Sequence, residues 1–176
     1  MRDLLVLFEH PEWFRPLFAA LDARGVDYEA VTPGVWDPAD PSPPARVVFN
    51  RIAMSSFLRS GEHPIFHATA MLDHWRRCGA TVVNGPEVLA IDSSKARQLS
   101  LLAGLGLAVP RTRVVHRAAD VEAAAEAVGF PLVVKANIGG SGAGIVRLDN
   151  MAELRAVVAE GQLFPTPATT AKPRWS

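Results

Sequence analysis

The chain has 176 residues, which is enough for one ordinary domain or for two small ones that share a core. Acidic and basic residues balance at 18 each with neither sign concentrated, which argues against a nucleic-acid binder that works through a basic face. Cys78 is the only cysteine, so no internal disulfide is expected and a reducing compartment is the default. The apolar run at residues 3–8 is too short to cross a bilayer. We therefore expect a soluble, cytoplasmic protein with no membrane and no nucleic acid among its partners.

The first half of the chain alternates strand and helix patterns. Strands are expected at residues 3–8, 28–31, 46–50 and 81–84, one helix along Trp13, Phe14, Leu17, Phe18 and Leu21, and a second helix from His63 to Arg77. The proline-rich stretch 33–44 can only be a loop. Strands that alternate with helices predict a parallel sheet covered on both faces. Residues 1–90 are thus predicted to form a small Rossmann-like α/β domain.

The pattern changes to α+β after Ile91. The expected elements are a helix capped by Asp92 with apolar positions Ala96, Leu99, Leu102 and Ala103, a strand at 112–115, a helix along 121–128, strands at 132–135 and 144–148, and a helix over 151–160 capped by Asn150 and Glu153. This second domain is predicted to cover residues 91–161. Residues 162–176 lack any periodicity and are predicted to be a disordered tail.

A glycine-rich segment carries the strongest chemical signal. A predicted strand ends in Lys135 and is followed by Gly139, Gly140, Ser141, Gly142 and Gly144. A Walker A loop would need Gly-Lys followed by Ser or Thr, and a dinucleotide fingerprint would open into a helix, whereas this loop opens into an expected strand. A hairpin turn needs only one or two glycines, so four glycines with a serine favour a flap whose N–H groups bind phosphate over a plain mobile turn.

Two lysines could supply positive charge to such a phosphate site. Lys135 ends its strand, where a lysine commonly extends to solvent but can also hold a polyphosphate beside the glycines. Lys95 lies in the first turn of a predicted helix, where the macrodipole disfavours a cation unless a negative group offsets it. Asp92 and a nucleotide phosphate are both candidates for that group, and the sequence does not decide between them.

The combination of segments resembles the ATP-grasp superfamily. The resemblance rests on residues 92–97, 101–102, 109–112, 130–135 and 139–144. Within the superfamily the spacing is similar to the RimK-type group, which includes ribosomal-protein glutamate ligase and relatives of glutathione synthetase. Residues 80–160 fit this pattern well, and residues 1–80 fit more loosely as the α/β domain that precedes the grasp. The implied fold is a Rossmann-like pre-ATP-grasp domain followed by the α+β N-terminal subdomain of an ATP-grasp fold.

The resemblance implies the chemistry of a carboxylate-amine ligase. In the family, ATP phosphorylates a small-molecule or peptide carboxylate, and an amine then displaces the phosphate. The residues at the positions of Lys95 and Lys135 contact ATP, and the loop matching Gly139, Gly140, Ser141, Gly142 and Gly144 folds over its phosphates. A second subdomain supplies acidic and asparagine ligands for Mg²⁺, and we find no counterpart after Gly161. We therefore expect a truncated, catalytically impaired chain with neither catalytic nor metal-binding residues.

An alternative is a non-catalytic, Rossmann-like module that regulates or binds a partner, with homo-oligomerisation through exposed apolar surface. Arg51, Ser55, Ser56 and Arg59 follow the third expected strand, where open α/β sheets bind ligands, although a solvated loop is the preferred explanation. The five histidines show no metal-binding spacing. An oligomer whose elution in gel filtration does not respond to ATP would favour this alternative over the ligase.

Overall fold

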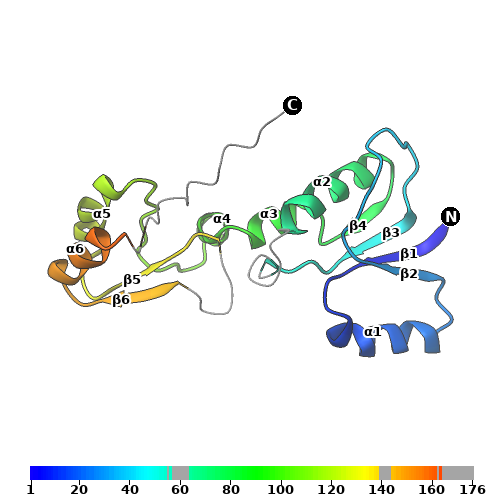
Figure 1. Cartoon of the computed structure of the whole chain (residues 1–176), viewed down its shortest axis with the longest axis horizontal. Coiled ribbons are helices and arrows are strands. Elements are labelled where there is room, and N and C mark those ends of the chain that lie inside the picture. Colours follow the sequence, from blue (N-terminus) through cyan, green and yellow to red (C-terminus); the bar gives the residue numbers. More distant parts are fainter. Residues whose placement is uncertain (55, 57–63, 139–143, 162, 164–176) are drawn as a thin grey trace. The chain divides into compact units, whose positions relative to one another are not determined.

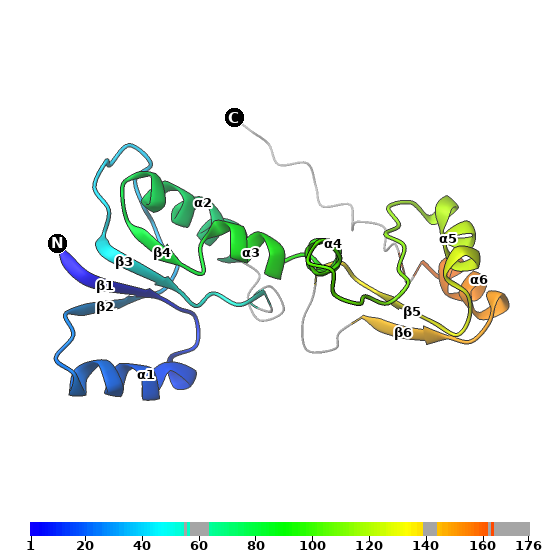
Figure 2. The ribbon, with the colours of Figure 1, turned by 180° about the vertical axis from the view of Figure 1, so that it is seen from behind.

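The chain forms two compact units, which are described one at a time. The structure is a computed structural model that describes residues 1–54, 56, 64–138, 144–161 and 163. The first unit contains residues 1–101 together with Asn137 and Ile138. The second contains residues 102–136 and those described from Gly144 onward. Both are shown in Figure 1 and, from behind, in Figure 2.

A parallel four-stranded sheet forms the centre of the first unit. Its strands are β1 (Arg2–Leu7), β2 (Tyr28–Val31), β3 (Ala45–Asn50) and β4 (Thr81–Val83), in the order β2-β1-β3-β4. Leu5 lies opposite Glu29 on one side and Val48 on the other. The parallel α/β arrangement expected from the sequence is confirmed. After β1 the chain forms β2 on one side of it and then crosses to form β3 on the other side. In open α/β sheets, ligands bind at such a reversal of strand order, beyond the carboxyl ends of the two strands, which here are β1 and β3.

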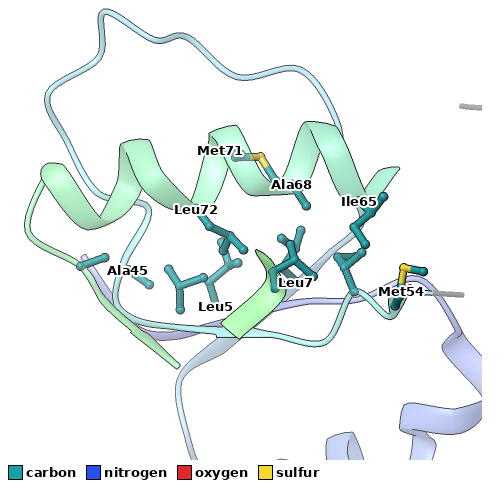
Figure 3. Close-up of a cluster of buried hydrophobic side chains, with 12 residues drawn as sticks. Leu5, Leu7, Ala45, Met54, Ile65, Ala68, Met71 and Leu72 are labelled. Carbon is teal, nitrogen blue, oxygen red and sulfur yellow. The ribbon is translucent and has the colours of Figure 1, made fainter. Parts of the chain in front are cut away.

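Both faces of this sheet are covered, which explains why β1 is apolar from Leu4 to its end. Leu5 and Leu7 join a core beneath helix α2 (Pro64–Arg77), whose Leu72 is fully buried (Figure 3). Val6 points to the opposite face, where it packs with aromatic residues of α1 (Pro11–Ala23). Successive strand residues face opposite ways, so one apolar run serves two cores.

Helix α3 (Pro86–Asp92) is an element that the sequence analysis missed. Pro86 stands at its first position, where a missing N–H costs nothing, and Leu89 is buried in the core beneath α2. Asn84 precedes it with a positive φ of 55°, a conformation that asparagine adopts more readily than most residues. The Asn84 side chain donates to the Asn50 carbonyl at 3.2 Å, and Asn50 returns a bond to the Asn84 carbonyl at 2.9 Å.

Two histidines of α2 hold the proline-rich loop at residues 33–44. His67 Nε2 lies 2.7 Å from the Gly34 carbonyl oxygen, and His74 Nε2 lies 3.0 Å from that of Asp40. Trp36 of the loop packs against the His74 ring, with ring centroids 4.9 Å apart. These contacts give both histidines a structural role. Throughout the described part of the chain, no group of three or more His, Cys, Asp or Glu residues could hold a metal ion.

The second unit is α+β, as expected. It contains the end of α4 (Lys95–Gly104), a 3₁₀ turn (Ala118–Asp120), α5 (Val121–Val128), the antiparallel pair β5 (Leu132–Lys135) and β6 (Ile145–Leu148), and α6 (Met151–Ala159). Its core gathers Val121, Ala125, Leu132, Leu148 and Leu154. None of the helices described in either unit is both long and apolar enough to cross a membrane.

The strand expected at 112–115 does not form. No neighbouring strand in the described structure pairs with this segment, and Val114 is 72% exposed. Helix α4 forms as expected, although none of its residues is fully buried. Whether a strand forms depends on a distant partner strand, which local periodicity does not reveal.

The N-terminus of α6 confirms the predicted cap. Asn150 Oδ1 accepts the Glu153 main-chain N–H at 3.0 Å, and the Glu153 carboxylate accepts from the Asp149 N–H at 2.9 Å. Only one residue of the predicted tail, Leu163, belongs to the described part, and it packs against the core of the second unit. The prediction for residue 162 and residues 164–176 lies outside the described residues.

An ion pair joins α5 to α6, and its contribution to the stability of the second unit is lost at low pH. Arg155 Nη2 lies 2.6 Å from Glu122 Oε2, and this hydrogen bond lowers the pKa of Glu122. A carboxyl group with a lowered folded-state pKa adds stability above its unfolded pKa and loses it as the pH falls through the folded value. We therefore expect Arg155→Gln to raise the pKa of Glu122 toward its usual range, measured by NMR titration of the carboxyl carbon. An unchanged pKa in the variant would contradict this pairing.

Candidate functional site

Lys95 begins helix α4, and the cap of that helix differs from the prediction. Asp92 ends α3, so it does not cap α4. Ser94 is the cap: its Oγ accepts the Arg97 main-chain N–H at 3.3 Å. The prediction was wrong because Asp92 and Ser94 are both good capping residues, and only the position where α3 ends decides between them.

Asn137 occupies the rest of the α4 N-terminus. Its main-chain oxygen accepts the Lys95 N–H at 3.0 Å, and its Oδ1 accepts the Ala96 N–H at 2.9 Å. Its Nδ2 lies 3.1 Å from Ser94 Oγ. The first three N–H groups of the helix therefore all have protein acceptors, and oxygens of Asn137, not Asp92, lie at the positive end of the macrodipole. Nothing in the local sequence could have shown this contact, because 43 residues separate Ser94 from Asn137.

Lys135 ends β5 on the outer face of the β5–β6 pair. It lies opposite Ile145, and Val133 on the same face lies opposite Arg147. All four side chains are exposed, whereas Leu132 and Leu148 face the core. Arg147 is paired with Asp149 at 2.9 Å. The face thus combines exposed aliphatic surface with cations, which suits a ligand that has an apolar ring at one end and negative charge at the other.

The glycine segment forms the connection of an antiparallel pair, as predicted. β5 and β6 are its two flanking strands, so it opens into a strand and not into a helix. This arrangement confirms the exclusion of the dinucleotide fingerprint. Gly144 has a φ of +67°, which most side chains avoid, and open space lies where a Cβ would stand. Gly139, Gly140, Ser141 and Gly142 lie outside the described residues.

The predicted site residues fall in both units. Lys95 belongs to the first unit, where the structure brings it together with Asn137. Lys135 and Gly144 belong to the second. The described residues do not form a site that suits Mg²⁺, because no cluster of acidic side chains is present among them.

A second group of polar residues lies where β1 and β3 end. Among the described residues, the only buried side-chain polar atoms without a hydrogen-bond partner are His10 Nε2 and Ser56 Oγ, and both follow these two strands. Glu9 accepts the Ala53 main-chain N–H at 2.8 Å. The Arg51 guanidinium lies over the rings of Phe14 and Phe49, 5.6 and 5.5 Å from their centroids. Ser55 and Arg59, which the sequence grouped with Arg51, lie outside the described residues.

Comparison with known sequences supports the resemblance. Residues 92–165 match the family described as the RimK-like ATP-grasp domain. The D-alanine--D-alanine ligase of Ralstonia pickettii is 32% identical over 140 residues, which cover 80% of this chain and 40% of that protein. The probable alpha-L-glutamate ligase of Vibrio vulnificus strain YJ016 is 30% identical over 101 residues, or 57% of this chain and 34% of that protein. The chain thus spans well under half the length of these relatives.

Comparison with solved structures gives the fold. A RimK domain ATP-grasp protein from Sphaerobacter thermophilus aligns with a TM-score of 0.69 at 20% identity, over 94% of this chain and 60% of that one. The N5-carboxyaminoimidazole synthetase of Staphylococcus aureus, solved with ADP, aligns with a TM-score of 0.59 at 15% identity, over 88% of this chain and 43% of that one. These structural matches confirm the predicted fold class, and together with the sequence matches they confirm the resemblance to the ATP-grasp superfamily.

Proposed function

We propose that this chain, whose residues 92–165 belong to the RimK-like ATP-grasp family, binds ATP through Lys95, Lys135 and the glycine segment. Lys135 carries the proposal because it stands on an exposed sheet face beside Val133 and Ile145. Its ammonium group suits a phosphate oxygen, and the two aliphatic side chains suit an apolar ring. The glycine segment contributes Gly139, Gly140, Ser141, Gly142 and Gly144 as the phosphate-binding residues.

The activity proposed for the complete catalytic unit is ligation of a carboxylate to an amine. D-Alanine--D-alanine ligase and alpha-L-glutamate ligase, the names of two relatives, both describe the joining of a carboxylate to an amine. ATP, when bound, supplies the phosphoryl group that activates the carboxylate. The part of this chain is to bind and orient the nucleotide with fixed charges, since catalysis of phosphoryl transfer is largely positioning and electrostatic stabilisation.

We further propose that residues 1–90 form the pre-ATP-grasp domain and residues 91–161 the nucleotide-binding part, working in the cytoplasm, where ATP and amino-acid substrates are available. The single cysteine suits such a reducing compartment. Small-molecule or peptide carboxylates and amines are the substrate classes that the relatives' names suggest.

ATP binding should be visible as stabilisation of the folded chain. A ligand that binds only the folded state raises stability in proportion to the logarithm of its concentration above the Kd. We expect the midpoint of thermal unfolding to rise steadily as ATP is added, and to stay unchanged with equal concentrations of inorganic sulfate. A midpoint that does not respond to millimolar ATP would refute the proposed function.

A non-catalytic partner-binding module is the second candidate, and one observation favours it. Helix α4 has no buried residue, and Leu105 and Leu107 after it are 66% and 55% exposed. Exposed apolar surface of this kind marks interaction sites. Gel filtration with and without ATP separates the two functions: an oligomer that does not respond to ATP supports the partner-binding module, whereas nucleotide-dependent elution supports the ATP-grasp proposal.

A further inference from the structure

Asn137 fastens the chain that leaves β5 to the first turn of α4. It stands two residues after Lys135. Its main-chain oxygen and its Oδ1 accept two successive helical N–H groups, at 3.0 and 2.9 Å. Because Oδ1 bonds the Ala96 N–H, Nδ2 is directed to Ser94 Oγ, 3.1 Å away. Three contacts from one residue fix the direction of the main chain at this point as well as its position.

A second anchor follows immediately. Ile138 is partly buried against the core that fills the space beneath α2. By their contacts, Asn137 and Ile138 belong to the first unit, whereas Lys135 and Ala136, directly before them, belong to the second. The chain therefore enters the first unit at Asn137 and is held there by a polar and an apolar contact in succession.

A helix cap alone would not require this arrangement. Ser94 already supplies the local cap of α4, through its bond to the Arg97 N–H. The N–H groups of the first helical residues are commonly satisfied by water or by nearby side chains. Here Asn137, from a distant segment, accepts two of these N–H groups. Asn137 also stands two residues after Lys135, which the proposed function assigns to ATP binding.

We propose that Asn137 is a positioning residue for ATP binding: it holds the main chain beyond Lys135 against the helix that begins with Lys95. The proposal rests on the proposed function, since it concerns the same nucleotide. Residue 137 needs a short side chain with an acceptor for the Ala96 N–H and a donor for Ser94, and asparagine provides both. Its contribution to binding comes from preorganisation, because a segment fixed beforehand loses less freedom when the ligand binds.

The test compares two asparagines with the same local role. Asn137→Ala removes an acceptor from the N-terminus of α4, and Asn150→Ala removes one from the N-terminus of α6. Both residues are exposed, so both variants are expected to fold with slightly lowered thermal midpoints. Calorimetric titration with ATP should give a Kd about tenfold weaker for Asn137→Ala and an unchanged Kd for Asn150→Ala. Only Asn137 holds the main chain that follows Lys135, the proposed ATP-binding residue. Hydrogen exchange of the Ala96 amide should accelerate only in Asn137→Ala.

The outcomes separate this inference from the proposed function. If wild-type protein binds ATP and Asn137→Ala binds it equally well, the inference is overturned while the proposed function stands. Equal weakening in both variants would also overturn it, because a general loss of stability would then suffice. If wild-type protein does not bind ATP, both proposals fail. Ser94→Ala serves as a second variant that keeps Asn137, and it should weaken binding in the same direction by a smaller factor.

Discussion

Replacing Lys135 by alanine is expected to weaken ATP binding by between ten- and a hundredfold. A hydrogen bond to a charged group contributes about 1.5–3 kcal/mol, and about 1.4 kcal/mol corresponds to a factor of ten in Kd. Lys135 is exposed, so solvent screening keeps the effect toward the lower end of this range. Isothermal titration calorimetry with ATP measures the change directly, and raising the salt concentration should weaken wild-type binding more than binding by the variant.

The matched control removes a positive charge elsewhere in the second unit. Arg113 is exposed, and its guanidinium donates to the neighbouring Thr112 carbonyl at 3.0 Å. Arg113→Ala should therefore leave the Kd for ATP unchanged. If Lys135→Ala and wild-type protein give the same Kd, the exposed face of β5–β6 is not the nucleotide site.

Leu72→Ala is expected to cause the largest loss of stability. The Leu72 side chain is fully buried between α2 and the sheet, within the core of twelve buried residues shown in Figure 3. Truncating a buried leucine costs about 2–5 kcal/mol, because transfer free energy is lost and a cavity is left behind. Domain stabilities are about 5–15 kcal/mol, so the midpoint of urea unfolding should fall steeply or the first unit should not fold.

The control for this prediction is another leucine truncation. Leu105 is 66% exposed, so Leu105→Ala should change the free energy of unfolding by no more than about 0.5 kcal/mol. A Leu72→Ala variant that unfolds at the same urea concentration as Leu105→Ala would mean that the space beneath α2 is not packed as described.

Strand β1 could be predicted because its residues Leu5 to Leu7 are buried on both faces of the sheet. Such strands leave continuous apolar runs in the sequence, and the spacing of glycine and proline residues marks where they end. The segment at 112–115 also favours a strand locally, through Thr112, Val114 and Val115, yet no strand pairs with it in the described structure. Local preference for strand is thus present in both cases, and only the presence of a neighbour decides the outcome.

The residues that cap the helices also show where prediction from local sequence fails. Asn150 was identified correctly, although Asp149 is also a good capping residue, because Glu153 stands three residues after Asn150, as a capping box requires. Before α4, Asp92 and Ser94 compete, and the unpredicted helix α3 uses Asp92 as its last residue. A short helix that begins at a proline leaves little periodicity to detect, so no local pattern favoured Ser94 over Asp92.

The candidate site was predictable only in part. Lys135 stood out because a lysine ended an apolar run and preceded a cluster of glycines, and the antiparallel β5–β6 pair confirms that those glycines lie between two strands. Lys95 stood out locally only as a cation in the first turn of a predicted helix, and family resemblance linked it to Lys135. Asn137 was missed altogether, since its partners lie 41 to 43 residues earlier in the chain. Long-range hydrogen bonds of this kind have no periodic signature.

The most direct test of ATP binding at Lys135 is an NMR titration of the unaltered chain with ATP. We expect saturable amide shifts that are largest at Lys135, at Gly144 to Val146 and at the first turn of α4, with much smaller shifts in the β2 strand. Shifts that centre instead on the loops after β1 and β3, or a spectrum that ATP leaves unchanged, would contradict it.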